Sequence, residues 1–254
     1  DNGAGRTAAN TQVRWTRNVM HNLIRECALA FNDLVAARFD NYHLDFWSAF
    51  TTPAGKQNGY NNMIGNIAPL TQGAIVANQT LPAATLNLPL PFFYSRDSGV
   101  ALPTAALPYN EMRINFSFRP WTDLLVAEQF GAVPGAAERR FNITVGSAAT
   151  DLLLTEPTMS NVNVWANYAI VSNDERKRMA CAPRDILIEQ VQTAPRQNFN
   201  PSTNQQPQYD IRFSHAIKVF FFSVRNRTWG SEWSNYTTNS PVPNAAGGGV
   251  NFNP

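Results

Sequence analysis

Three histidines are the residues of this sequence best suited to acid–base or metal chemistry. His21, His43 and His215 are isolated, and none has a cysteine or carboxylate partner at metal-site spacing. A zinc site needs several such ligands together. His215 falls on the apolar face of a strand expected at 211–224, so we interpret it as a hydrogen-bonded core residue rather than a ligand. We therefore expect no metal site.

The neighbouring acids Asp174 and Glu175 have the chemistry of a general acid and base, but a structural role explains them. Ser172 and Glu175 have the spacing of a capping box, in which Ser is the N-cap residue of a helix and Glu follows three residues later. The sequence thus predicts a short helix, DERKRMA, that ends before Pro183.

Nucleotide-binding and hydrolase motifs are missing from the sequence. Gly55, Gly59 and Gly65 follow no predicted strand and precede no Lys-Ser/Thr pair at P-loop spacing. No G-x-S-x-G elbow occurs. We predict no catalytic, cofactor-binding or metal-binding residue, and the sequence provides no case for an enzyme.

The tryptophans allow two interpretations. Exposed indoles could line a sugar platform, as in β-sandwich lectins, whereas buried ones would pack the core and subunit interfaces. We favour core and interface packing. The residues concerned are Trp15, Trp47, Trp121, Trp165, Trp229 and Trp233.

Composition and charge favour a protein that contacts other proteins. The chain is 44% hydrophobic, contains 17 Pro and 16 Phe, and is only 15% charged, against roughly 25% in average soluble proteins. The net charge is +2. The basic run Arg176–Arg178 follows two acids and forms no stripe of the kind that binds nucleic acid. These features suit an all-β protein and indicate no direct nucleic-acid partner.

The two cysteines, Cys27 and Cys181, are far apart, and we interpret them as buried thiols in a reducing compartment. No secretory signal and no apolar run of about eighteen residues occurs, so we expect no membrane insertion. Most glycosylation sequons are therefore interpreted as chance matches in an Asn-rich chain. They begin at Asn78, Asn115, Asn142, Asn226 and Asn235.

The stretch 88–118 organises the predicted fold. At its end, Met112, Ile114, Phe116 and Phe118 alternate with polar residues such as Glu111, which is typical of a strand with one buried face. Its first part, the proline-bracketed 88–94, is expected to be a second strand, with prolines at strand starts or edges. A polar corner joins the two.

Earlier segments mix loop, strand and helix signals. Residues 1–12 read as a loop, and 19–31 fit a strand and a helix nearly equally. Spacings of three residues between Leu44, Trp47 and Phe50 predict a helix that Pro53 and Gly55 end. The motif GYNNMIG suggests a second helical turn, and 67–79 reads as a loop.

Later segments return to strands after a linker. Residues 121–127 are a candidate helix, and 131–137 (GAVPGAA) is the best linker by composition. About eight strands in total, without βαβ alternation, indicate antiparallel sheets, as in a jelly roll. The strands expected after the linker are Phe141–Val145, Leu152–Thr155, Val162–Val171, Ile186–Gln192 and Ile211–Val224.

Several motifs in order resemble one family. The stretch LPLPFFYSRDSGVALPTAALPYNEMRINFSF is similar to the end of the first jelly roll in major capsid proteins of large nucleocytoplasmic DNA viruses, nearest the iridovirus-like branch. Flanking segments that resemble the family include RWTRNVMHNLI, GYNNMIGN, NYAIVSNDERKRM, ILIEQVQTAPRQNF, IRFSHAIKVFFFSVRN and SNYTTNSPV. The resemblance covers roughly 13–242 and favours a strand at 19–31.

The resemblance implies an all-β double jelly roll of which this chain holds only the middle. Residues 1–119 would be the C-terminal part of the first jelly roll, 120–140 a linker with a short helix, and 141–254 the N-terminal part of the second. An isolated chain of this kind would expose unpaired strand edges and aggregate.

The function implied by the resemblance is structural. Such proteins form pseudo-hexameric homotrimers that tile the icosahedral capsid of a double-stranded DNA virus and assemble in the host cytoplasm. The expected partners are other copies of the chain and minor capsid proteins. The competing hypothesis is a β-sandwich that binds carbohydrate or attaches to a host.

Overall fold

The computed structural model describes residues 11–71, 81–107, 109, 111–129, 139–142, 157–183, 185–198, 203, 208–224 and 233–236. Its strands are β1 (Thr11–Trp15), β2 (Ile24–Phe31), β3 (Leu34–Phe39), β4 (Met112–Phe118), β5 (Leu125–Gln129) and β6 (Arg139–Asn142). Its helices are α1 (Val19–Leu23), α2 (Asn41–Thr51), α3 (Ala54–Ile64), α4 (Ala68–Thr71) and α5 (Asn173–Cys181). Three short 3-10 turns are η1 (Ser98–Val100), η2 (Thr104–Ala106) and η3 (Trp121–Asp123).

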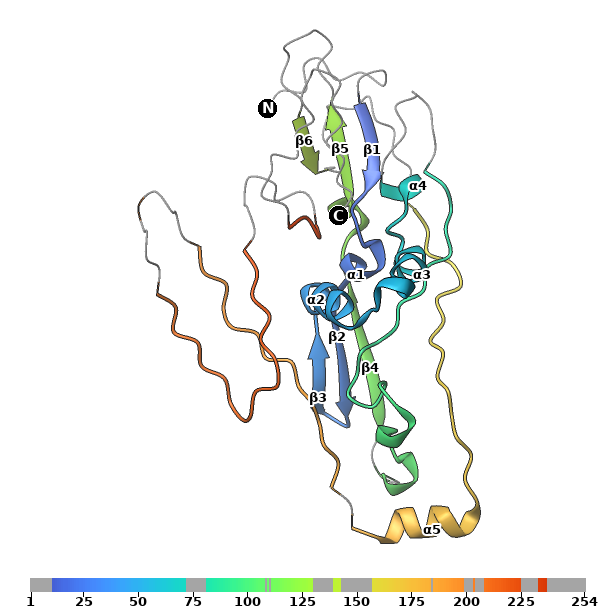
Figure 1. The fold of residues 1–254 in the computed structure, drawn as a ribbon. Helices are drawn as coiled ribbons and strands as arrows, with labels where there is room; N and C mark the ends of the chain where they lie inside the picture. Colours follow the sequence, from blue (N-terminus) through green and yellow to red (C-terminus); the bar gives the residue numbers. More distant parts are fainter. Residues whose placement is uncertain are drawn as a thin grey trace.

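One antiparallel sheet has the strand order β3-β2-β4. Cys27 in the central strand pairs with Phe39 on one side and Phe116 on the other. The β2–β3 turn begins at Asn32, whose φ of 52° lies in the left-handed region that Asn tolerates better than most residues. In Figure 1 this sheet occupies the middle of the molecule.

A second antiparallel sheet, β1-β5-β6, lies at the end of the molecule opposite α5 (Figure 1). It shows that the helix expected at 121–127 is wrong: the chain makes one 3-10 turn, η3, and then pairs as β5 with β1, Trp15 opposite Leu125. Burial of Leu125 and Val126 beside β1 overrides the local helical signal. Strand β6 begins two residues before the strand expected at 141–145 and overlaps it at 141–142. Residues 131–137, 143–145 and 152–155 lie outside the described residues.

Residues 19–31 contain both of the structures that their pattern allowed. The helix α1 covers Val19–Leu23, and β2 begins at the next residue, Ile24. The strand favoured by the family resemblance is therefore correct only for the second part. The loop expected before Val13 also ends slightly earlier, because β1 begins at Thr11.

The two helices expected after residue 40 are found as α2 and α3, but α3 is longer than the single turn expected at 59–65 and contains Gly55, which was expected to end the preceding helix. The Asp40 side chain caps α2 by accepting a hydrogen bond from the backbone N–H of His43 at 2.9 Å. Pro53 separates the two helices. Helix α3 ends at Gly65, whose φ of 81° is strained in residues that carry a Cβ and is therefore best adopted by glycine. The loop expected from 67 contains the single turn α4, and its remainder lies outside the described residues.

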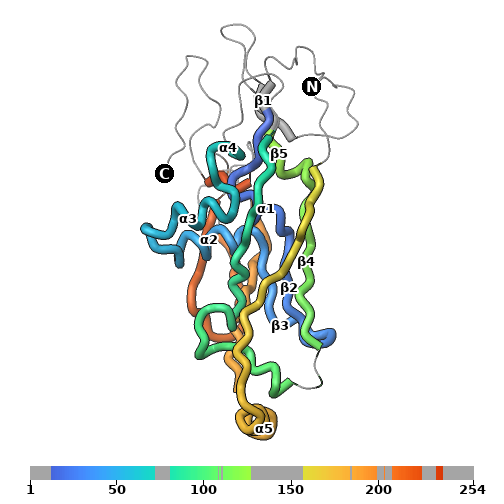
Figure 2. Tube along the Cα trace, turned by 90° about the vertical axis from the view of Figure 1, so that its right-hand side faces the viewer, coloured from blue at the N-terminus to red at the C-terminus, as the bar shows by residue number. Residues whose placement is uncertain are grey.

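The core lies between the β3-β2-β4 sheet, α2 and the segment 88–94. Figure 2 shows α2 and α3 on one side of this sheet. Its buried members are Ile24, Cys27, Leu29, Ala37, Phe39, Leu44, Phe92 and Phe93. The segment 88–94 contributes two of them without forming the strand that was expected. Pro89 and Pro91 lack the N–H groups that a ladder needs, so the segment packs by its side chains instead.

Strand β4 confirms the alternation predicted for 112–118 at its centre and not at its ends. Ile114 and Phe116 pack against the core, while Glu111 and Arg113 are exposed and form an ion pair. Met112 and Phe118, at the two ends, are 39% and 43% exposed. Backbone hydrogen bonds join β4 to β2 alone among the described strands.

The strands expected at 162–171, 186–192 and 211–224 are wrong: these segments run as extended chain without a ladder (Figure 1, yellow to orange-red). Alternating residues permit a strand, but only a partner strand creates one. Leu187 and Phe222, on two of these segments, are 83% and 85% exposed. His215, expected in the core, is exposed at a φ of 68°. The helix starting after Ser172 is confirmed as α5.

The cysteines differ from each other. Cys27 is buried in the core, as expected, but Cys181 at the end of α5 is exposed, which corrects the prediction of two buried thiols. Burial, reinforced by the charge of Glu26, raises the pKa of the Cys27 thiol to about 12. Among the described residues, none of the helices is both long and apolar enough to cross a bilayer.

Candidate functional site

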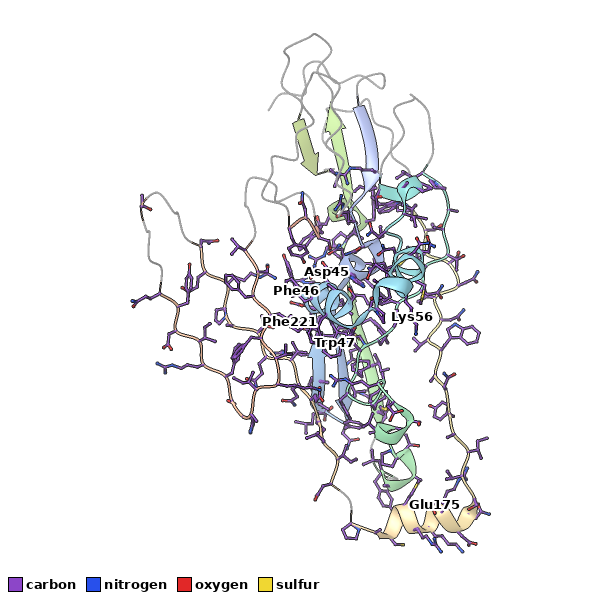
Figure 3. The ribbon with its side chains drawn as sticks, in the orientation of Figure 1. Asp45, Phe46, Trp47, Lys56, Glu175 and Phe221 are labelled. Carbon is purple, nitrogen blue, oxygen red and sulfur yellow. The ribbon has the colours of Figure 1, made fainter. Side chains whose placement is uncertain are left out.

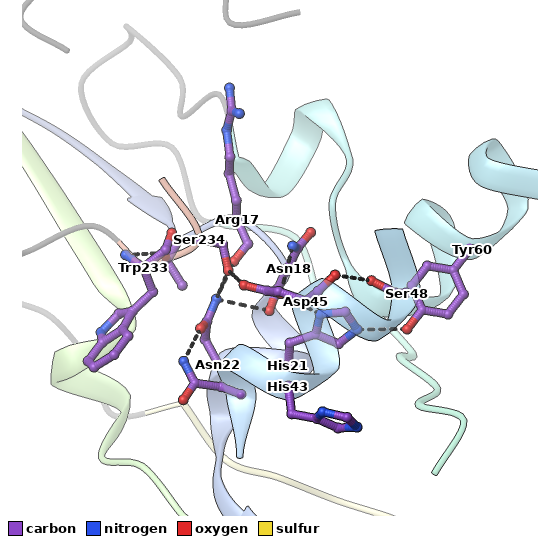
Figure 4. Close-up of polar contacts among 12 residues, drawn as sticks. Arg17, Asn18, His21, Asn22, His43, Asp45, Ser48, Tyr60, Trp233 and Ser234 are labelled. Carbon is purple, nitrogen blue, oxygen red and sulfur yellow. Dashed lines mark hydrogen bonds and ion pairs between the residues drawn. The ribbon is translucent and has the colours of Figure 1, made fainter. Parts of the chain in front are cut away.

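A buried carboxylate, Asp45 on α2, collects hydrogen bonds from residues that are far apart in the sequence (Figure 4). Its Oδ1 lies 2.6 Å from Nδ1 of His21 and accepts from the amide of Asn18 at 3.0 Å. Its Oδ2 accepts from the hydroxyls of Ser234 at 2.6 Å and Tyr236 at 2.8 Å. With 6% of its surface exposed, Asp45 depends on these donors to compensate for the loss of water.

His21 connects Asp45 to helix α3. Its Nδ1 faces the carboxylate, and its Nε2 lies 2.8 Å from the hydroxyl of Tyr60. Burial raises the pKa of Tyr60 to about 12, against the effect of a hydrogen bond with Ser48 and with a further contribution from the charge of Asp45. The Tyr60 hydroxyl therefore stays protonated at neutral pH and remains available to His21.

Asn22 and Asn41 extend the cluster on the other side. The Asn22 amide donates to the Ser234 hydroxyl at 2.7 Å and to the carbonyl of Arg17 at 2.7 Å, and its own oxygen accepts from Asn41 at 2.9 Å. Both asparagines are almost completely buried. In each of the two side-chain amides, both the nitrogen and the oxygen have a hydrogen-bond partner. The network therefore fixes the positions of α1 and α2.

An aromatic and cationic stack borders the polar cluster. The Arg119 guanidinium lies 3.9 Å from the centre of the Trp233 ring, and the Tyr42 ring meets that indole edge-on. Arg196 in turn lies 4.5 Å from the Tyr42 ring. Burial lowers the pKa of Arg119, although the guanidinium remains charged. The stack joins residues 119, 196 and 233 around α2.

The outer side of α2 carries further aromatic contacts (Figure 3). Phe221 stacks on Phe46 and also meets Phe50 edge-on. His43 stacks on Trp47 with ring centroids 5.9 Å apart, and Arg96 lies over the same indole. Burial lowers the pKa of His43; Asp40 opposes this shift and Arg96 adds to it.

Arg96 also belongs to a partly exposed ion-pair network. It forms an ion pair with Glu189, which accepts a second hydrogen bond from Lys218 at 3.0 Å. Partial burial disfavours ionisation of Glu189, but the hydrogen bonds from Lys218 and Arg96 prevail and hold the pKa of Glu189 below its usual value. The network ties 185–198 and 208–224 to each other and to Trp47 through Arg96.

The tryptophans follow the packing interpretation in part. Trp47 and Trp233 take part in the intramolecular contacts just described. Trp15 and Trp121 are half-buried, whereas Trp165 is 88% exposed on an extended segment. Trp229 lies outside the described residues.

The cluster contains the residue types of a hydrolytic triad but not its connections. In a triad, the nucleophilic Ser bonds to His, and His bonds to Asp. Here Ser234 donates to Asp45, and Nε2 of His21 is occupied by Tyr60. Within the described part of the chain, no group of three or more His, Cys, Asp and Glu has the geometry of a metal site. The arrangement acts as a structural junction.

The sequence contained one signal for this junction that the histidine-based reading missed. Asn41, Asp45 and Ser48 occur at spacings of four and three residues, so they form a polar stripe on the buried face of α2, next to Leu44. Polar residues at core positions need partners from elsewhere in the chain. The sequence around α2 does not indicate that these partners are His21 and residues 233–236.

Comparison with known proteins gives the family. The family model for the N-terminus of the major capsid protein matches residues 2–171. The model for the large eukaryotic DNA virus major capsid protein matches residues 175–250. The chain belongs to the major capsid protein family. The resemblance on which the sequence-based expectation depended is therefore confirmed.

Curated relatives of this capsid protein agree. The major capsid protein of Wiseana iridescent virus is 61% identical over 97% of this chain and 50% of its own length. That of Costelytra zealandica iridescent virus is 62% identical over 95% of this chain and 51% of its own length. That of Frog virus 3 is 42% identical over 94% of this chain. The chain spans about half the length of the curated relatives it matches.

A solved structure was compared with the fold of this chain. A crystal structure of PBCV-1 VP54, fitted into a cryo-EM reconstruction of the virophage Sputnik, aligns with 72% of this chain and 39% of that chain. The TM-score of this alignment is 0.48 and the sequence identity is 21%. The two matched family ranges meet between residues 171 and 175, at the Ser172 cap of α5.

Proposed function

We propose that this chain is part of a structural virion protein that builds the capsid of a large double-stranded DNA virus. The observation that carries the proposal is the match of both capsid family models, in order, along residues 2–171 and 175–250. Identity of about 60% to curated iridovirus capsid proteins, spread over nearly the whole chain, supports it. Nothing in these matches indicates an enzymatic family.

Exposed apolar side chains support a role in protein contacts. They are concentrated on the extended segments 157–171, 185–198 and 208–224, which no ladder or helix in the described part of the chain covers. Apolar surface of this kind usually marks an interaction site. The most exposed examples are Val162, Trp165, Tyr168, Ile170, Leu187, Phe220 and Phe222.

The proposal extends to fold and assembly. The complete protein would contain two successive jelly rolls, with residues 1–119 in the first and most of 141–254 in the second. The segment 120–140 is more than a linker, because β5 and β6 join it to β1 in one sheet. Antiparallel sheets without βαβ units are compatible with this architecture. Three subunits with two jelly rolls each would form a pseudo-hexameric capsomer, packed against its neighbours and minor capsid proteins in an icosahedral shell assembled in the host cytoplasm.

The oligomeric state of the protein produced from its complete gene tests the proposal. Native mass spectrometry should give a trimer, and negative-stain images should show particles with a six-fold outline. The same preparation should bind no glycan on an array. A monomer under all conditions would contradict the capsomer proposal, and a monomer that binds glycans would support the carbohydrate-binding hypothesis.

A further inference from the structure

We propose that Trp233–Tyr236 is a docking segment, and that α1, α2 and the chain around Arg119 form its receptor. The segment lies within the second matched family range, and every receptor residue lies within the first. Docking would therefore connect the two matched regions of the chain through one defined set of contacts. The inference concerns contacts within one chain and does not depend on capsid assembly.

The Asp45 carboxylate gives the first argument. Among the described residues, Asn18 and His21 of the receptor and Ser234 and Tyr236 of the segment bond to this carboxylate. Without the segment, Oδ2 would lose both of the donors described for it while remaining in a largely buried place. An under-bonded buried carboxylate is strongly unfavourable, so Asp45 selects for hydroxyl donors at these two positions.

Trp233 gives the second argument, because both its side chain and its main chain are held. The indole Nε1 donates to the carbonyl of Asp123 at 3.0 Å, and the ring lies against Arg119. The main-chain N–H donates to Oγ1 of Thr16 at 3.1 Å, and the same hydroxyl donates back to the Trp233 carbonyl at 3.0 Å. Phe would lose the indole hydrogen bond, so the receptor is specific for Trp.

Arg119 is itself held in place for this role. Its Nε donates to the carbonyl of Asn22 at 3.0 Å, and its Nη2 reaches the side chain of Asn41 at 3.3 Å. Both asparagines belong to the buried network around Asp45. The indole contact and the carboxylate contact are therefore parts of one rigid surface.

Backbone conformation gives the third argument. Ser234 has a φ of 56° and Asn18 a φ of 49°, both in the left-handed region, and both side chains bond to Asp45. Such conformations cost energy in residues with a Cβ and persist where surrounding contacts hold them. Both residues with this conformation bond to the Asp45 carboxylate, so these hydrogen bonds determine the local backbone conformation. The receptor thus recognises a bent peptide with Trp, a hydroxyl and a Tyr.

Hydrogen exchange measured by mass spectrometry on the protein from its complete gene tests the inference. In the double variant Ser234→Ala/Tyr236→Phe, the peptide that carries 233–236 should exchange at least about tenfold faster, because two bonds to a carboxylate are lost. Trp233→Ala should have the same effect. Tyr209→Phe, on an exposed part of the chain, is the matched control.

Hydrogen exchange of the receptor in the same double variant gives a reciprocal test that leaves Asp45 unchanged. The double variant changes only the segment, so circular dichroism should show the same secondary structure while exchange in α1 and α2 accelerates. Unchanged exchange in both the double variant and Trp233→Ala would overturn the inference. So would protection that disappears when the assembled protein is dissociated to monomers, because the segment would then be supplied by a neighbouring copy.

Discussion

The Nδ1 atom of His21 lies 2.6 Å from Oδ1 of Asp45, and the two side chains are only 0% and 4% exposed. The Arg113–Glu111 pair at the start of β4 has nearly the same separation, 2.7 Å, but its side chains are 55% and 65% exposed. The two pairs therefore differ mainly in solvent access. This difference decides how much each contributes to the free energy of unfolding.

Removal of one partner from the buried pair should be costly. His21→Ala should lower the free energy of unfolding by about 1–3 kcal/mol, because it removes one of the hydrogen bonds to a buried carboxylate. Arg113→Ala is the matched control and should leave stability unchanged within error. Urea unfolding followed by circular dichroism measures both. Equal effects of the two substitutions would contradict the role assigned to burial.

The cost of truncating an aromatic side chain in the core should likewise depend on how deeply the ring is buried. Phe92 is 2% exposed at the centre of the core, so Phe92→Ala should cost about 3–5 kcal/mol, as large truncations in cores do. Phe116 packs against the core from a half-buried position on β4, so Phe116→Ala should cost clearly less. Denaturant unfolding of both variants checks the order. A larger effect at Phe116 would show that β4, rather than 88–94, closes the core.

The two thiols should be distinguishable by alkylation. Burial raises the pKa of Cys27 to about 12, so this thiol is protonated and inaccessible in the folded protein at pH 8. Cys181 is exposed and should react with iodoacetamide under the same conditions. Peptide mapping should find the label at Cys181 alone, and at both cysteines after denaturation. Rapid labelling of Cys27 in the native protein would contradict its position in the core.

His43 should make stability depend on pH. Its pKa is lowered in the folded state, chiefly by burial, so the unfolded state binds the proton more readily. The stability that His43 contributes is therefore present above its ordinary pKa of 6.5 and is lost as pH falls below that value. His43→Phe keeps a ring for Trp47 and removes this titration. Thermal unfolding between pH 5 and 8 should show a smaller slope in the variant than in the wild type.

The ends of the helices can be predicted from the sequence because the residues that cap them lie close by in the chain. Family membership can be predicted because the family motifs occur in a fixed order. Asp40 and Ser172 cap α2 and α5 within three residues of their own positions, and Pro53 and Gly65 mark the limits of α3. The alternation at 112–118 predicted β4 for the same reason. The order of short motifs was sufficient to indicate the capsid family before any fold was known.

Pairing partners, in contrast, were decided by tertiary structure. Residues 125–129 form β5 because β1, more than a hundred residues earlier, offers an edge, although their own sequence suggested a helix. Residues 211–224 have a better alternating pattern and form no strand, because no described segment pairs with them. Hydrogen bonds between strands depend on a neighbour, which a single segment cannot specify.

The junction at Asp45 shows the same limit most clearly. Asn41, Asp45 and Ser48 make a polar stripe that the sequence displays, and the stripe requires partners once α2 is buried. Those partners come from 24 residues before Asp45 and 189 residues after it. A sequence determines that a buried carboxylate must be satisfied, because desolvation is costly wherever it occurs. Only the folded chain determines that His21 and Ser234 satisfy it, because their proximity is a property of the packed helices.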